Sequence, residues 1–140
     1  MINFYSENDF SLGEEEIYKS WLCRVISSEE KRLGEISYIF CDDEYLLDIN
    51  QRFLNHDTYT DIISFDDSLG NLLNGDIYIS TERVLENAKE YNEDFATELK
   101  RVLVHGVLHY CGYKDKTEED AALMREKEIE KIELFHVEQS

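Results

Sequence analysis

The sequence is poor in the features that mark modular, secreted or membrane proteins. It has no proline, no internal repeat and no low-complexity tract, so we expect no linker within its 140 residues. No apolar run approaches the length of a bilayer span, and the N-terminal residues do not form a basic segment followed by an apolar one. The 3 cysteines are too few and too widely spaced for a disulfide framework or a cysteine-only zinc site. These absences predict a single domain over residues 1–140, located in the cytoplasm and without a membrane partner.

Basic residues are also scarce. The 14 lysines and arginines are outnumbered by 32 aspartates and glutamates, which gives a formal net charge of −18. A field of this sign repels phosphate backbones and anionic membrane surfaces. A function on nucleic acid therefore requires a local basic patch or delivery by a partner.

Hydrophobic residues are present in sufficient number, at 42%, to build a folded core. Apolar alternation predicts strands at residues 2–5, 35–41, 61–65 and 75–80. Helical spacing predicts helices at 14–28, 42–53, 81–91, 94–111 and 117–132, with a capping box at Ser11 and Glu14 and a cap at Thr117. The predicted fold is one α+β domain, a mixed sheet of about four strands packed against about five helices.

The segment from His105 to Asp115 has the spacing of a metal site. His105 and His109 are four residues apart, so on a helix they lie one turn apart on one face and can bind one ion. Gly112 can end that helix and let the chain turn back, which brings Asp115 within reach as a third ligand. Three protein ligands leave a position for water, as in catalytic zinc sites. We therefore predict one zinc ion per chain on a central helix.

Other interpretations of these histidines stay open at this stage. Two histidines on a buried helix can be ordinary core residues, although buried imidazoles need polar partners. Two histidines and a carboxylate are also the ligands of iron(II) oxygenases. Zinc proteases carry a glutamate directly after the first histidine, where this chain has Gly106, so peptidase activity is disfavoured.

The histidine segment resembles the signature H-G-x-L-H-L-x-G-Y-D-H of the YbeY family, bacterial endoribonucleases and rRNA maturation factors. The matching residues are His105, Gly106, Leu108, His109, Gly112 and Tyr113. A second family block, D-x-P-T-D-V-L-S-F followed by G-D-I-x-I, is similar to residues 57–65 and 75–79. The resemblance spans roughly residues 48–124 and implies an α+β domain with a zinc site that acts on rRNA in small-subunit maturation.

Three positions depart from the family pattern. Asp115 stands where the family has its third histidine, and an anionic ligand makes a bound zinc a weaker Lewis acid. We therefore expect activity to shift toward higher pH. Leu54 stands at the position of the family's active-site arginine, so a phosphate-binding group is missing there. Tyr59 replaces a proline, which changes loop rigidity more than chemistry.

Three basic residues near the motif are expected to bind substrate, namely Lys114, Lys116 and Arg101, although isolated lysines are also ordinary surface charges. The predicted function is a zinc-dependent endoribonuclease that cleaves single-stranded RNA during rRNA processing and ribosome biogenesis. Its expected partner is rRNA or the pre-ribosomal small subunit, together with a ribosomal protein or assembly GTPase, and not DNA. The alternatives are a non-catalytic, metal-stabilised ribosome-assembly factor and a metal-dependent hydrolase of another substrate.

Overall fold

A computed structural model describes residues 1–139 of the chain, with side chains described through Phe135. The strands are β1 (Ile2–Ser6), β2 (Arg32–Cys41), β3 (Ile62–Asp66) and β4 (Leu72–Ser80). The helices are α1 (Glu15–Ser28), α2 (Asp43–Leu54), α3 (Thr81–Glu90), α4 (Phe95–Tyr110) and α5 (Glu118–Gln139). Over residues 1–139 this is the predicted α+β architecture, with a mixed sheet of four strands and five helices.

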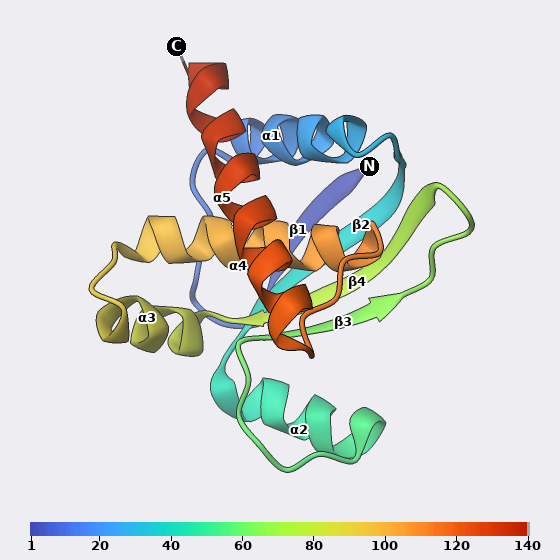
Figure 1. Cartoon of the computed structure of the whole chain (residues 1–140). Coiled ribbons are helices and arrows are strands. Elements are labelled where there is room, and N and C mark those ends of the chain that lie inside the picture. The colour runs from blue at the N-terminus through green and yellow to red at the C-terminus, as the bar shows by residue number, and fades with distance from the viewer. Residues whose placement is uncertain (140) are drawn as a thin grey trace.

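The sheet has the strand order β1-β2-β4-β3 (Figure 1). Strands β1, β2 and β4 run parallel, and β3 pairs antiparallel with β4 at one edge. Parallel neighbours need a crossover connection, and α1 provides the one between β1 and β2. The antiparallel β3 needs only the short connection through residues 67–71.

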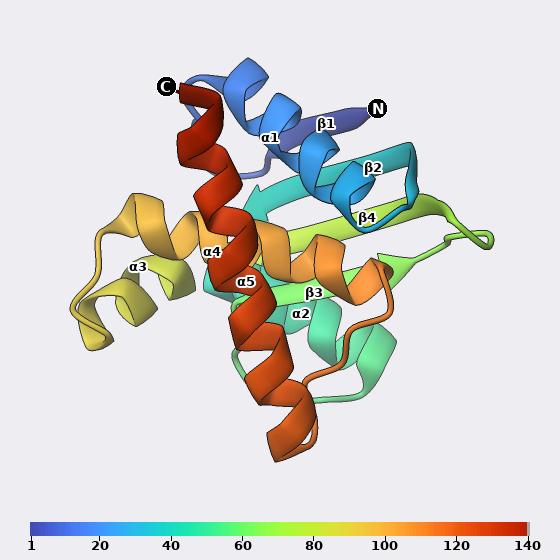
Figure 2. The same ribbon diagram turned by 45° about the horizontal axis from the view of Figure 1, so that its top comes forward.

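The helices are distributed unequally over the two faces of the sheet. Helices α1 and α4 lie on one face and α5 crosses over them, whereas α2 lies on the other face (Figures 1 and 2). Side-chain alternation explains the division, because Ile77 of β4 belongs to the main core while Tyr78 packs with the small core beneath α2. The site therefore forms on the side that holds the larger core.

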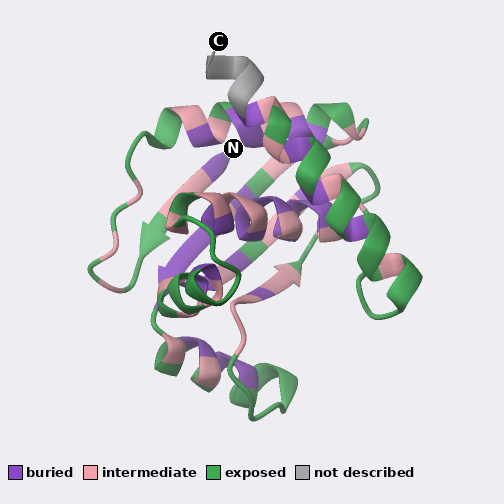
Figure 3. Cartoon of the chain, turned by 60° about the vertical axis from the view of Figure 1, so that its left-hand side comes forward, coloured by how far each residue is buried: buried purple, intermediate pink, exposed green. Residues whose placement is uncertain are grey.

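Helix α4 is the most deeply enclosed element. It is apolar on nearly all sides, and buried residues are concentrated on it and on the strands that face it (Figure 3). Its fully enclosed side chains are Leu99, Val102, Leu103, Val104, Val107 and Leu108. A Cβ added at Gly106 would lie 2.9 Å from Ile77 Cδ1, so glycine lets the helix approach the sheet closely. This close packing sets the depth at which the neighbouring histidines sit.

The helix ends differ in part from the sequence prediction. The capping box is wrong, because Ser11 lies outside the helix and Glu14 is the N-cap in a left-handed conformation, φ 55°, without a side-chain cap. The Thr117 cap is confirmed by a hydrogen bond of 3.0 Å from the Asp120 amide to its hydroxyl. Helix α5 also extends beyond Ile132 to Gln139. Among the described residues, no helix combines the length and apolar character needed to cross a membrane.

Candidate metal centre

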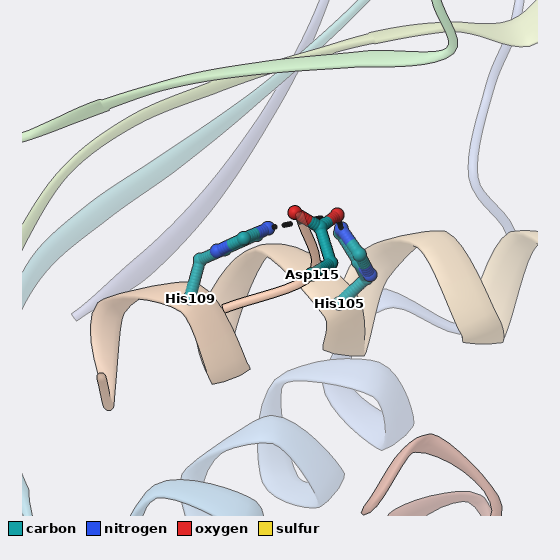
Figure 4. A group of neighbouring side chains, drawn as sticks. All are labelled: His105, His109 and Asp115. Atoms are coloured by element: carbon teal, nitrogen blue, oxygen red, sulfur yellow. Dashed lines mark ion pairs between the residues drawn. The ribbon is translucent and has the colours of Figure 1, made fainter. Parts of the chain in front are cut away.

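Helix α4 and the loop after it bring three metal-ligand side chains together. His105 and His109 lie one turn apart on α4, and Gly112 adopts φ 107°, a conformation that favours glycine and turns the chain back. Asp115 Oδ2 consequently lies 3.3 Å from His105 Nε2 and 3.4 Å from His109 Nε2. Figure 4 shows both imidazoles directed at this carboxylate.

This group fits a divalent metal ion. One ligand atom from each of His105, His109 and Asp115 lies within 4.8 Å of the others, so one ion can reach all three. Two imidazole nitrogens and one carboxylate oxygen are a donor set found in catalytic zinc sites. Of the side chains in residues 1–135, this is the one such group of three or more ligands.

Glu128 of α5 supports His105 from behind. Its Oε2 lies 2.6 Å from His105 Nδ1, and the Glu128 side chain is only 2% exposed. When Nδ1 donates its proton to this carboxylate, the lone pair of Nε2 is left free and faces Asp115. Packing of α5 on α4 therefore sets both the tautomer and the orientation of one candidate ligand.

A partly buried ion-pair network surrounds Glu128. Arg101 donates two hydrogen bonds to Glu98, at 3.0 and 2.6 Å, and lies 3.5 Å from both Glu128 and Asp61. Burial alone lowers the pKa of the Arg101 guanidinium, but the three carboxylates raise it above its ordinary value. Burial raises the pKa of Asp61, an effect strengthened by Glu98 and opposed by Arg101 and His105. The network holds Arg101 in a fixed, neutralised position.

The three candidate ligand side chains line a cleft of about 320 Å³. Its opposite wall carries Thr60, Asp61 and Ser64, from the segment that leads into β3 and from β3 itself. This wall offers hydroxyl and carboxylate oxygens, so the lining of the cleft is mostly polar. Thr60, Asp61 and Ser64 all belong to the second sequence block, residues 57–65, so both sequence blocks meet at this cleft.

The basic residues predicted to bind substrate have different surroundings. Arg101 lines the cleft, but its guanidinium is already paired with carboxylates. Lys114 and Lys116 are exposed on either side of Asp115 in the loop. Leu54 ends α2 and is not among the residues that line the cleft. Substrate binding by the three basic residues stays a prediction.

Glu128 is the supporting residue that sequence reasoning missed. It stands in a stripe of buried positions on α5, together with Met124, Lys131 and Phe135. A charged residue at a buried position of a helix requires a polar partner, which is the signal that could have drawn attention to Glu128. The sequence did not indicate that this partner is His105.

Comparison with known proteins agrees with this arrangement. The family model described as Endoribonuclease YbeY matches residues 3–136. A protein named Endoribonuclease YbeY from Christiangramia forsetii is 66% identical over 138 residues, which cover 99% of this chain and 96% of that protein. One of the same name from Flavobacterium johnsoniae is 64% identical over 139 residues, covering 99% and 100% respectively.

A solved structure supports the fold as well. The solution structure of TM1509 from Thermotoga maritima is similar, with a TM-score of 0.74 and 28% sequence identity, over 99% of this chain and 91% of that one. The match with the family model and the high identity to these relatives confirm the resemblance found in the histidine and β-strand blocks. The chain belongs to the YbeY family of endoribonucleases.

Proposed function

We propose that the protein is a zinc-dependent endoribonuclease that cleaves single-stranded RNA in rRNA processing of the small ribosomal subunit. The observation that carries this proposal is the convergence of His105, His109 and Asp115 on one point of a mostly polar cleft. Family membership supports the endoribonuclease activity, and the donor set supports zinc. The role in rRNA comes from the family resemblance.

The chain's own side chains have distinct tasks in this proposal. His105, His109 and Asp115 hold the ion, and Glu128 keeps Nε2 of His105 free to bind it. When bound, zinc supplies Lewis acidity that stabilises charge on a phosphodiester and lowers the pKa of a water. The oxygens of Thr60 and Ser64 border the space that the scissile phosphodiester enters.

The charge of −18 indicates how substrate reaches the cleft. Free RNA is repelled at long range by such a surface, and the repulsion is strongest at low salt. We therefore propose that the protein acts on RNA within a pre-ribosomal particle, with a ribosomal protein or an assembly GTPase as the docking partner.

Metal analysis tests the central claim. Elemental analysis of protein purified without added metal should find about one zinc per native chain and little in His109→Ala, because one of three ligands is lost. His56→Ala is the matched control, since His56 is an exposed loop histidine and its replacement should leave the zinc content unchanged. Iron in the native protein would support the oxygenase interpretation, and no metal would overturn the zinc proposal.

Cleavage of a single-stranded rRNA fragment tests the reaction. The native chain and His56→Ala should cut it, whereas His109→Ala should lose at least about a hundredfold in rate if metal chemistry dominates. If His109→Ala still folds and supports particle maturation as well as the native chain, the non-catalytic assembly role is favoured. Leu54, in place of the family arginine, is the observation behind that alternative.

A further inference from the structure

The cleft at the metal centre continues toward α5. A second hollow, of about 230 Å³, shares Arg101, His105 and Asp115 with the cleft and reaches Tyr91 and Arg125. A third, of about 240 Å³, shares Tyr91 and Arg125 with the second and lies between the first turns of α4 and the middle of α5. Because the hollows share lining residues, they form one path that passes the candidate ligands and continues between α4 and α5.

Arg125 is the cation on this path with free hydrogen-bond donors. Its side chain is 66% exposed, and its ion pair joins Nε to Glu128 Oε1 at 3.6 Å, beyond hydrogen-bond distance. Among the described residues, no hydrogen bond engages its two terminal nitrogens. Arg101, by contrast, is paired with three carboxylates. A phosphate can therefore be bound by Arg125 without breaking an existing network.

Tyr91 supplies an aromatic surface on the same path. It directly follows α3, is 57% exposed, and its hydroxyl has no hydrogen bond among the described residues. An exposed tyrosine ring that stacks on no aromatic ring of the described residues is suited to stack on a nucleobase, and such stacking tolerates any base. A cation and an aromatic ring along one groove are the two elements of single-strand binding sites.

We propose that Tyr91 and Arg125 form an RNA subsite beside the metal centre, in which Arg125 binds a backbone phosphate and Tyr91 stacks on a base. The subsite rests on the proposed ribonuclease function. It provides, from α5, the phosphate-binding cation that is missing at Leu54 on α2. The single strand then crosses the cleft and leaves between α4 and α5 rather than past the end of α2.

Binding of a fluorescein-labelled single-stranded oligouridylate, followed by fluorescence anisotropy, tests the subsite. Arg125→Ala should weaken binding about 5- to 20-fold and lower the slope of log affinity against log salt by about 0.7, because one phosphate contact is lost. Arg125→Lys should recover part of the affinity. Arg52→Ala is the matched control, since Arg52 is 70% exposed on α2 and paired with Asp48 at 3.2 Å, and it should change affinity less than twofold.

Tyrosine variants test the stacking contact in the same assay. Tyr91→Ala should weaken binding about tenfold, and Tyr91→Phe should retain most of the affinity because the ring remains. Tyr5→Ala, at a 54% exposed tyrosine of the edge strand β1, is the control and should bind like the native chain. Unchanged zinc content in the Arg125 and Tyr91 variants would show that the loss does not act through Glu128.

The outcomes separate this subsite from the proposed function. If the native chain binds and cleaves RNA while Arg125→Ala and Tyr91→Ala behave like their controls, the subsite is overturned and the ribonuclease function stands. If the native, zinc-containing chain neither binds nor cleaves RNA, both proposals fall. Selective losses in the two variants, with a raised KM and a nearly unchanged kcat, would support the subsite.

Discussion

The imidazole of His105 is bound on both sides by carboxylates, with Asp115 toward the cleft and Glu128 toward the core. Only the first of these contacts can be replaced by a metal ion, because Glu128 is enclosed behind the ring. Partners behind a metal ligand usually contribute 10- to 100-fold to metal affinity, roughly, through the orientation and basicity of the ligand. Glu128 is therefore a positioning residue for the candidate metal centre.

Replacement of Glu128 by glutamine tests this role. Glu128→Gln should weaken zinc binding by at least about tenfold, since a neutral amide holds the Nδ1 proton less strongly than a carboxylate. Competition with a chromophoric chelator measures the affinity, and circular dichroism checks the fold. Glu130→Gln, two positions along and 56% exposed, is the control. Equal zinc affinity in both variants would contradict the positioning role.

The identity of the third ligand leads to a prediction about pH. Asp115 adds a negative charge to the ligand set, which weakens the Lewis acidity of a bound zinc and raises the pH at which activity develops. Asp115→His should move the ascending limb of the pH–rate profile to lower pH, by about one unit. The measurement is kcat/KM for RNA cleavage between pH 5 and 9 with zinc present, and superimposable profiles would refute the effect.

At the scale of elements, the loop that carries Asp115 is held to α1 and α5 through the side chain of Glu29. The hydroxyl of Tyr113 donates to Glu29 at 2.7 Å, and Lys131 of α5 lies 2.8 Å from the same carboxylate. Glu29 immediately follows α1, so one side chain connects α1, the loop and α5. Because Tyr113 is two residues from Asp115, this contact restricts where the third ligand can go.

The Glu29 carboxylate also makes the free energy of unfolding depend on pH. Burial raises the pKa of Glu29, but hydrogen bonds from Lys131 and Tyr113 and the charges of Lys131 and Lys127 lower it below its ordinary value of 4.5. Because the pKa of Glu29 is lower in the folded state than in the unfolded state, its charge stabilises the fold. This stabilisation is complete above about pH 4.5 and is lost as the pH falls through the pKa of Glu29 in the folded protein.

Glu29→Gln should therefore lower the free energy of unfolding at pH 7. The difference between the variant and the native chain should shrink as the pH falls below 4.5. Urea unfolding of the native chain and the variant across this range measures the difference in free energy. Glu30→Gln is the neighbouring control and lacks these contacts among the described residues. A difference that stays constant with pH would indicate that the effect comes from side-chain shape and not from charge.

For the whole molecule, the dominant electrostatic fact is the excess of acidic residues. Exposed ion pairs such as Arg52–Asp48 contribute little, whereas the repulsion summed over a net charge of −18 acts across the whole surface. Screening should weaken the repulsion more than it weakens the pairs. The folded state is therefore expected to gain stability from moderate salt.

Thermal unfolding measures this gain. Between 20 mM and 300 mM NaCl, the Tm of the zinc-saturated protein should rise by about 3–5 °C, the equivalent of roughly 1 kcal/mol for a domain of this size. Equal osmolality of sucrose instead of salt provides the control for effects that do not involve charge. A Tm that falls with NaCl would show that attractive pairs, including the partly buried network at Arg101, outweigh the repulsion.

The local sequence pattern predicts the strands and helices of this fold but not their arrangement. Alternation and helical spacing predicted every strand and helix, because both depend on which side of a short segment is apolar. The capping of α1 was predicted wrongly, since its N-cap is Glu14 in a left-handed conformation and not Ser11. The strand order β1-β2-β4-β3 also could not be read from the pattern, because it depends on pairing between distant segments.

At the candidate metal centre too, some features follow from the sequence and others only from the tertiary structure. The sequence by itself determined that the candidate ligands His105, His109 and Asp115 lie together, because they are close enough along the chain for helix geometry and the turn at Gly112 to bring them within reach of one another. Only the tertiary structure decided that Glu128 supports His105, 23 residues away, and that Arg101 is neutralised while Arg125 has free donors. These relations depend on how α5 packs across α4, and that packing follows from burial of apolar surface over the whole core, which the spacing within one segment does not encode.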